Sequence, residues 1–212
     1  MTPRKQYYET IANTLIDKMK PRGIDAYYVS DSKEALDFIK NMLTPGASVS
    51  FGGSATLKEI GFHDFITHST DYQVFDRTTA TTPEEKRKMY QEIVGCDYFF
   101  MSSNAITLDG ELVNIDGYGN RVACLIAGPQ QVVIVAGMNK IVPDVDSAIA
   151  RVRNIAAPPN TIRLNKNTPC ASTGRCGNCL SDDCICCQTV ITRKSSIPNR
   201  IQVILVGETL GF

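Results

Sequence analysis

The feature of this chain that most constrains its fold is a regular alternation of short apolar runs with amphipathic helical segments. Runs of strand length occupy residues 26–30, 47–51, 72–75, 97–101 and 132–137. Apolar side chains recur at helical intervals in residues 4–20, 31–42, 55–60, about 13 residues after Pro83, and 144–155. Parallel strands need long crossover connections, usually helices, so the alternation predicts an α/β fold of Rossmann-like type with a mainly parallel sheet.

One segment, residues 104–129, interrupts the alternation. Asp109 and Gly110 lie between the stretches ITL and ELVNI, which predicts a hairpin with a two-residue turn, because glycine accepts a positive φ without steric cost. A second polar turn follows at residues 116–120. Amide and carboxyl side chains of this segment are expected to converge at one edge of the sheet, with ordinary turn chemistry as the alternative.

Composition limits the setting and the partners of the chain. Its 212 residues and 43% hydrophobic content are enough for one large domain with an appendage. We expect a domain of residues 1–165 and a cysteine-rich tail, 166–212, whose final strand, IQVILV, returns to the main sheet. Lysine plus arginine and aspartate plus glutamate both number 22, which disfavours a nucleic-acid partner. The start, MTPRKQYYET, lacks the apolar core of a signal peptide, and no apolar stretch is long enough to cross a bilayer, so we expect a soluble cytoplasmic protein.

Six of the eight cysteines fall between Cys170 and Cys187, a density typical of a metal site or of redox chemistry in a reducing compartment. Two four-thiolate sets are available within this run. The compact set has the spacing C-x2-C-x4-C-x2-C and comprises Cys176, Cys179, Cys184 and Cys187. Zinc ribbons separate their cysteine pairs by about 15–20 residues, so this set is cramped for a ribbon.

A second candidate site is the loop in SVSFGGSATLKEIG, where a strand is followed by Gly52, Gly53 and Ser54 and then by a helix. Glycines allow a ligand to approach the backbone, and the free amide groups of a first helical turn bind anions. An anion pocket is therefore one interpretation. The alternative is that Ser54 only caps the helix, since the loop matches neither Walker A nor G-x-G-x-x-G.

Four stretches of the chain, FGGSATLKEIG, SSNAITLDGELVNIDGYGNR, GMNKIV and TPCASTGRCGNC, together resemble the lactate-utilisation (LUD) domain family, in its short form with a cysteine-rich C-terminal tail. The resemblance spans most of the chain. It implies the α/β fold of the NagB, ribose-phosphate isomerase and CoA-transferase superfamily. It also implies a link to the oxidation of L-lactate to pyruvate, usually beside iron-sulfur partner proteins.

The same resemblance implies a ligand cleft for a small anionic metabolite. On one side it places the superfamily's ligand loop, which comprises Gly52, Gly53, Ser54 and Thr56. Across the cleft it places Asn104, Asp109, Asn114, Asp116, Asn120 and Arg121. CoA-transferases use a nucleophilic glutamate that has no match here, so a CoA-transferase mechanism is not expected, and the catalytic residues stay unassigned.

Lys140, in the GMNKIV segment after an apolar strand, is a further candidate ligand residue. A lysine at the end of a parallel strand reaches the edge of the sheet where ligands of such folds bind. A solvated lysine, with its stem along the surface and its ammonium group in water, is the alternative.

The resemblance also selects the wider cysteine set, which comprises Cys170, Cys176, Cys179 and Cys186. Four soft thiolates suit an iron-sulfur cluster of the 4Fe-4S type, although the spacing differs from that of ferredoxins. Cys184 and Cys187 are then additional, and structural zinc is the alternative metal.

Three hypotheses of function follow. The leading one is a LUD-type protein linked to lactate utilisation, an oxidoreductase component that binds a small anion and a 4Fe-4S cluster and passes electrons to a redox partner protein. The second is an isomerase or transferase acting on a sugar phosphate or thioester, with structural zinc. The third is a non-catalytic, metal-stabilised binding subunit, and an oligomer is compatible with each.

Overall fold

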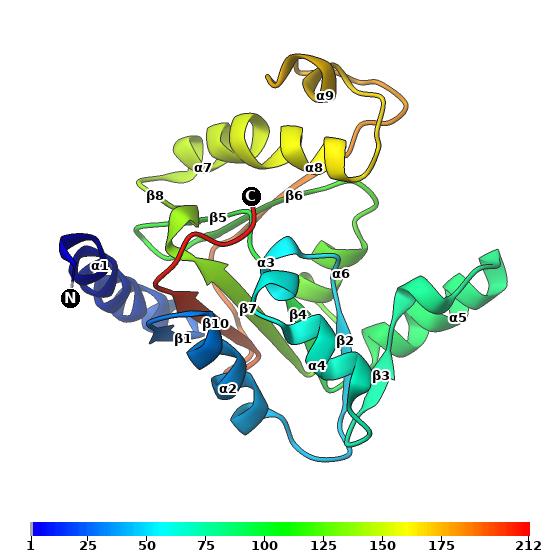
Figure 1. Cartoon of the computed structure of the whole chain (residues 1–212), viewed down its shortest axis with the longest axis horizontal. Helices are drawn as coiled ribbons and strands as arrows, with labels where there is room; N and C mark the ends of the chain where they lie inside the picture. Colours follow the sequence, from blue (N-terminus) through cyan, green and yellow to red (C-terminus); the bar gives the residue numbers. More distant parts are fainter. Residues whose placement is uncertain (1) are drawn as a thin grey trace.

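The computed structural model describes residues 2–212, and it confirms the predicted α/β fold (Figure 1). A six-stranded sheet has the order β1-β10-β7-β4-β2-β3, and every pair in it is parallel. Its strands are β1 (Ile24–Val29), β10 (Ile201–Val206), β7 (Gln131–Gly137), β4 (Tyr98–Met101), β2 (Ser48–Phe51) and β3 (Gln73–Phe75). The last strand in sequence, β10, lies inside the sheet between β1 and β7.

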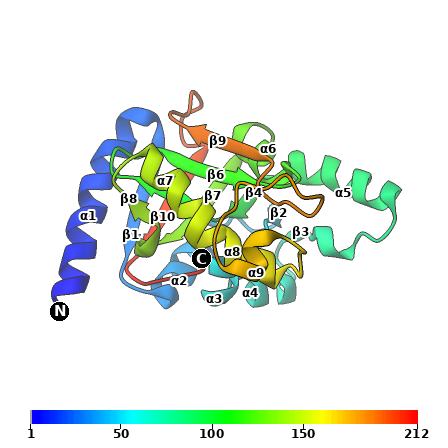
Figure 2. The same ribbon diagram turned by 90° about the horizontal axis from the view of Figure 1, so that it is seen from above.

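Helices cover both faces of this sheet (Figures 1 and 2). One core packs beneath α1 (Pro3–Met19), α5 (Pro83–Val94) and α6 (Asn120–Ile126). The other packs beneath α2 (Ser32–Met42), α3 (Ala55–Glu59) and α4 (Phe62–His68). Burial on both faces explains why the central strands are continuous apolar runs. None of the helices within residues 2–212 has both the length and the apolar character that spanning a membrane requires.

A second, four-stranded sheet has the order β8-β5-β6-β9. Its strands are β8 (Ile141–Val142), β5 (Ala105–Thr107), β6 (Leu112–Asp116) and β9 (Gln188–Thr192). The hairpin β5–β6 confirms the predicted one, but pairing of Thr107 with Glu111 leaves a loop of three residues, 108–110, rather than two. Gly110 supplies the positive φ of this loop, at 88°.

The helix expected over residues 144–155 continues to Arg163. It comprises α7 (Val145–Arg151), a π-helical turn η4 (Val152–Ala156) and α8 (Ala157–Arg163). Pro158 and Pro159 lack the amide hydrogen that an α-helix needs, and the wider turn precedes them directly. This long helical segment covers the second sheet through a small core that includes Val113, Ala148 and Val152.

The cysteine-rich tail begins in α9 (Pro169–Thr173) and continues as a loop, residues 174–187, without helix or strand. The loop then enters β9, which pairs antiparallel with β6. Figure 2 shows that α9 and the loop lie beside α8, on the outer side of the second sheet. The tail is thus joined to the main body at both of its ends.

Arg200, which is buried directly before β10, provides a test of this architecture. Its guanidinium donates to the carbonyl oxygens of Cys124 (2.8 Å), Leu125 (2.7 Å) and Pro129 (3.2 Å) at the end of α6. We expect Arg200→Met to lower the free energy of unfolding by about 2–4 kcal/mol, because three buried acceptors lose their donor. Urea unfolding followed by circular dichroism measures this. The exposed Lys194→Met is the matched control, and an equal loss in both variants would contradict the prediction.

Candidate functional site

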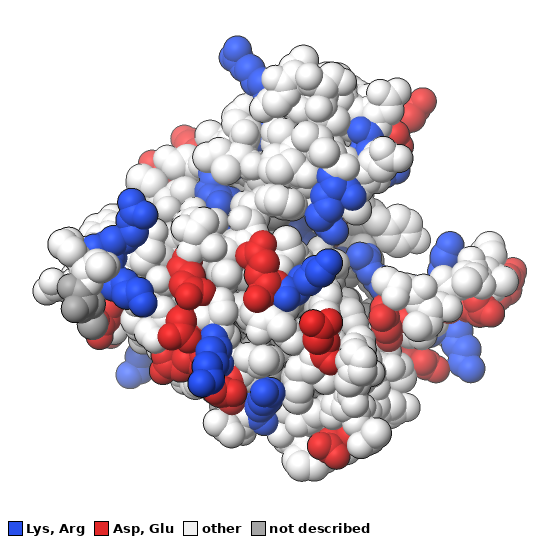
Figure 3. Space-filling model, viewed as in Figure 1, with Lys and Arg blue, Asp and Glu red and all other residues white. Residues whose placement is uncertain are grey.

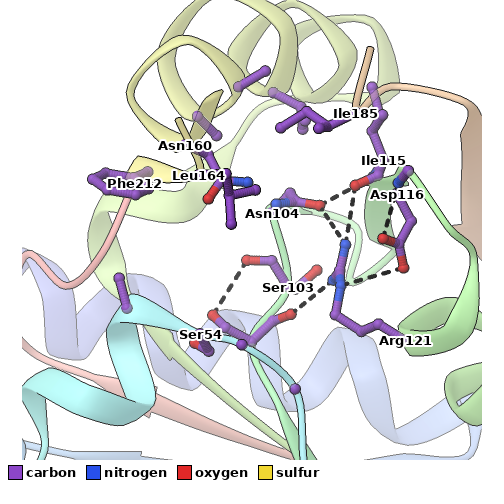
Figure 4. Close-up of a pocket in the computed structure, with 18 of the residues that line it drawn as sticks. Ser54, Ser103, Asn104, Ile115, Asp116, Arg121, Asn160, Leu164, Ile185 and Phe212 are labelled. Carbon is purple, nitrogen blue, oxygen red and sulfur yellow. Dashed lines mark hydrogen bonds and ion pairs between the residues drawn. The ribbon is translucent and has the colours of Figure 1, made fainter. Parts of the chain in front are cut away.

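A cleft of about 270 Å³ lies at the carboxyl ends of three neighbouring strands, β2, β4 and β7. Figure 3 shows lysine and arginine side chains gathered around a hollow between the layer that carries α8 and the body that carries α3. Figure 4 shows side chains from both layers pointing into it. Ligands of open parallel sheets bind at this edge, so the cleft is the candidate functional site.

Each of these strands delivers polar residues to the cleft as it ends. β2 leads into the loop Gly52–Thr56, β4 leads into Ser102 and Ser103, and β7 leads into the 3₁₀ turn η3 (Met138–Lys140). Because β7, β4 and β2 are adjacent in the sheet, the three segments meet. The Ser54 hydroxyl accepts a hydrogen bond from the Leu57 amide at 3.3 Å and so caps α3, whereas the loop as a whole lines the cleft.

Most of the residues expected to bind a ligand are brought together here. The cleft is lined by Gly52, Gly53, Ser54, Thr56, Asn104, Asp116, Asn120, Arg121 and Lys140. Asp109 lies elsewhere, in the hairpin loop, where its carboxylate is 3.8 Å from the ammonium group of Lys18. Asn114 is fully buried beside the cleft, and its Oδ1 accepts from the Asn104 amide and from Arg121.

The guanidinium group of Arg121, on α6, forms hydrogen bonds and an ion pair with other groups of the protein (Figure 4). Nη1 donates to Ser102 O at 3.1 Å and to Asn114 Oδ1 at 2.6 Å. Nη2 donates to Asn104 Oδ1 at 2.9 Å and to Ile115 O at 3.0 Å. Nε lies 3.6 Å from the Asp116 carboxylate. Burial lowers the pKa of Arg121, and Asp116 opposes that shift. Arg121 therefore holds the wall of the cleft together.

The solvated alternative for Lys140 is wrong, because only 4% of its surface is exposed. Its ammonium nitrogen donates to Thr56 Oγ1 and Ser102 Oγ, both at 2.9 Å. Burial, reinforced by the charges of Arg151 and Arg121 and opposed by Glu59, lowers the pKa of Lys140 to about 7. Lys140 is therefore a lysine that titrates near neutral pH in the floor of the cleft.

Several lining residues were not predicted from the sequence, among them Arg77, Ser102, Ser103, Asn160 and Arg163. The two serines could have been predicted from the sequence, because they directly follow the strand DYFFM and so lie at the carboxyl end of a parallel strand. The others come from the 3₁₀ turn η2 (Arg77–Thr79) and from α8, which only tertiary packing brings to this edge. A Cβ atom on Gly53 would lie 2.8 Å from Arg77 Nη2, so the absence of a side chain at Gly53 lets Arg77 lie over the loop.

A second cavity, of about 210 Å³, is lined by five thiols. They include the whole wider set, Cys170, Cys176, Cys179 and Cys186, together with Cys184. Cys187 is exposed and does not line the cavity, although the compact set requires it. No group of three or more His, Cys, Asp or Glu side chains in residues 2–212 is positioned to hold a metal ion.

The thiols of this cavity differ in their electrostatic environment. Burial and the neighbouring thiols, Cys184 first, raise the pKa of Cys186 to about 12. Burial alone would raise the pKa of Cys176, but hydrogen bonds from the Asn178 amide (3.5 Å) and from Arg153 Nε (3.4 Å) outweigh it and lower the pKa. Hydrogen bonds from Ser181 lower the pKa of Cys179. Cys176 and Cys179 thus favour the thiolate form that metals bind.

The two cavities share one wall. Ile115, Ala157, Ile185 and Cys186 line both. The backbone is close-packed there, since a Cβ atom on Gly117 would lie 3.2 Å from the Cα atom of Ile185. The thiol cavity and the cationic cleft are therefore neighbours that share residues of β6, α8 and the cysteine loop.

Comparison with known proteins places this geometry in a family. The family model for the LUD domain matches residues 12–206 of this chain. A DUF162 family protein from Deinococcus radiodurans has a similar crystal structure, with a TM-score of 0.56 and 15% identity over 94% of this chain and 98% of that one. The chain also matches eIF2B delta from Chaetomium thermophilum, with a TM-score of 0.34 and 12% identity over 68% of this chain and 55% of that one. A search of the curated proteins found no match.

The depressed pKa of Lys140 predicts a pH-dependent stability. Between about pH 7 and about pH 10 the unfolded chain binds a proton that the folded chain does not, so the free energy of unfolding rises with pH. In this window we expect the free energy of unfolding of wild type, relative to that of Lys140→Met, to rise by at most about 1.4 kcal/mol per pH unit. Urea unfolding across the window measures the difference. Lys58→Met, at an exposed position, is the control, and a difference that does not vary with pH would contradict the prediction.

Proposed function

We propose that this chain, which belongs to the LUD domain family, is a redox protein linked to lactate utilisation. In this proposal it binds a small carboxylate or phosphate anion in the cleft and a 4Fe-4S cluster in the thiol cavity. The observation that carries the proposal is the wall the two cavities share, because Cys186 lines both of them. A redox group there would lie next to a bound anion.

The charge of the cleft supports an anionic ligand. Its charged lining residues are Arg77, Arg121, Arg163, Lys140 and a single carboxylate, Asp116. Asp116 is paired with Arg121. Within residues 2–212 Arg163 has no ion-pair partner, and it donates to Asn160 Oδ1 at 2.7 and 3.0 Å. A cleft with unbalanced positive charge attracts anions and strengthens hydrogen bonds to them. Arg77 and Arg163 are thus free to bind a carboxylate or phosphate group.

The number of cysteines that line the thiol cavity is what supports a cluster in this proposal. A mononuclear site requires ligands that converge on one point, whereas a 4Fe-4S cluster takes one thiolate at each iron, so its cysteines surround a core. Cys170, Cys176, Cys179 and Cys186 all line one cavity, and in this proposal each would supply one thiolate. Arg153 would balance part of the negative charge through its hydrogen bond to Cys176. A bound cluster would supply one-electron transfer.

A redox partner protein would approach at the tail. Leu180, which lines the thiol cavity next to Cys179, has 99% of its surface exposed. An electron acceptor docked over this part of the loop would be separated from the cavity by the loop alone. The anion cleft opens on the other side of the shared wall, so ligand and partner would not compete for the same surface.

The cluster is tested by anaerobic purification followed by absorption spectroscopy and by iron and sulfide analysis. We expect a brown wild-type protein that contains iron and sulfide. Cys176→Ser should abolish the colour, because it removes one of four ligands, and Cys187→Ser is the matched control that should retain it. If Cys184→Ser lost as much colour as Cys186→Ser, the proposed set of four cysteine ligands would be wrong. A colourless protein with stoichiometric zinc would favour the isomerase or transferase hypothesis.

The anion cleft is tested by calorimetric titration with oxalate, L-lactate and inorganic phosphate. We expect at least one of them to bind, and Arg163→Met to weaken its affinity about tenfold, or about 1.4 kcal/mol, because a charge-assisted hydrogen bond is lost. Arg87→Met, at an exposed position of α5, is the control for lost charge. Failure of all three anions to bind, or equal affinity in Arg163→Met, would contradict the assignment of the cleft.

A further inference from the structure

Lys140 is the most buried of the basic side chains that line the anion cleft. It follows β7 in the turn η3, and its position beneath the cleft is fixed by two hydroxyl groups, those of Thr56 and Ser102. A charge-binding role does not require such burial, because Arg77 and Arg163 already supply charge at the exposed rim. Deep burial of an amine is instead an arrangement that activates it as a nucleophile.

The hydrogen bonds around Lys140 match the needs of a neutral amine. The Thr56 hydroxyl donates to Leu210 O and the Ser102 hydroxyl donates to Ser103 O, both at 3.4 Å. Each hydroxyl oxygen is thereby left to accept one N–H from Lys140. A neutral amine has two hydrogens, and both are satisfied by these acceptors. Its lone pair is then left for the cleft that Lys140 lines.

The charges around Lys140 also favour the neutral form. Arg151 is buried nearby and donates to Asn139 O at 3.1 Å and to Asn104 O at 2.7 Å. No carboxylate within residues 2–212 lies within 4.0 Å of the Lys140 nitrogen as an ion-pair partner. The carboxylate of Glu59, which opposes the lowered pKa of Lys140, accepts a hydrogen bond from the Gly211 amide at 2.7 Å. The pKa of about 7 leaves a large neutral fraction at neutral pH.

We propose that Lys140 forms an imine with the ketone carbon of a small 2-oxo acid bound in the cleft. The proposal rests on the proposed anion cleft, since Arg77 and Arg163 would hold the carboxylate while the ketone faces the lysine. A cleft of about 270 Å³ limits the ligand to a small molecule. The 2-oxo acids are the class that carries an anionic group directly beside an electrophilic carbonyl.

The reaction is balanced without an oxidant or reductant. The lone pair of Lys140 attacks the carbonyl carbon, and the carbonyl oxygen takes up a proton as the amine nitrogen releases one. The hydroxyl group of the resulting carbinolamine takes up a proton from the solvent and leaves as water, and the C=N bond of a protonated, cationic imine forms. The cationic imine withdraws electrons from the neighbouring carbon, so a C–H bond at that carbon becomes acidic. The nitrogen of the protonated imine keeps one hydrogen, which the hydroxyl oxygen of Thr56 or Ser102 would accept.

Reductive trapping tests the imine. Purified protein is incubated with pyruvate, reduced with sodium borohydride, and analysed by intact mass and peptide mapping. We expect one reduced pyruvyl adduct per chain, located on Lys140, and no adduct without borohydride. Lys140→Arg should lose the adduct, and Lys58→Arg, at an exposed position of α3, should retain it. Peptide mapping of the wild-type protein gives the result even if the Lys140 variant fails to fold.

Titration with oxalate and inorganic phosphate, which have no electrophilic ketone, separates the two proposals. If either anion binds but pyruvate leaves no adduct on Lys140, or leaves adducts spread over exposed lysines, the imine is overturned and the anion cleft stands. If no anion binds and no adduct forms, both proposals are overturned. Exchange of the methyl hydrogens of pyruvate in deuterated water, lost in Lys140→Arg, would further support the imine.

Discussion

The buried guanidinium of Arg121 is the interaction on which the geometry of the site depends. It joins the segment after β4, through Ser102 O and Asn104, to strand β6, through Asn114 and Ile115 O. The first segment follows β4 of the six-stranded sheet and β6 belongs to the four-stranded sheet, so Arg121 holds the second sheet against the edge of the first. A buried charge is costly unless it is paired and hydrogen-bonded, and Arg121 meets both conditions. The cleft is therefore a consequence of how the two sheets are joined.

Much of the main sheet was predictable because its strands are buried on both faces. β4, β7 and β10 are continuous apolar runs, and their flanking glycines and polar residues mark their ends. The order of the strands was not predictable, since it depends on which crossovers pass over the sheet. β8 and β9 were missed for another reason: β8 has two residues, and β9 is a partly exposed strand whose partner β6 is distant in sequence.

The site was predictable where a residue directly follows a strand and not where packing decides. Gly52, Ser54 and Thr56 follow β2, so their convergence with Asn104 follows from the parallel sheet itself. Lys140 also follows a strand, but its burial depends on Thr56 and Ser102, which come from two other strands. The local sequence GMNKIV resembles an ordinary polar turn, and nothing in it shows that hydroxyl groups lie above the lysine. Arg163 lies in α8, beyond residue 155, where the apolar periodicity predicted that the helix would end.

Asp116, which lines the anion cleft, also contacts the end of the cysteine loop. Its carboxylate pairs with Arg121 and accepts the Val122 amide at 3.3 Å, while its carbonyl accepts the Cys187 amide at 2.9 Å. One residue thus contacts both the arginine that holds the cleft and the end of the cysteine loop. A rearrangement of the loop that moves Cys187 acts on the backbone of Asp116, and through its side chain on Arg121. The position of the end of the cysteine loop and the wall of the anion cleft therefore both depend on contacts of Asp116.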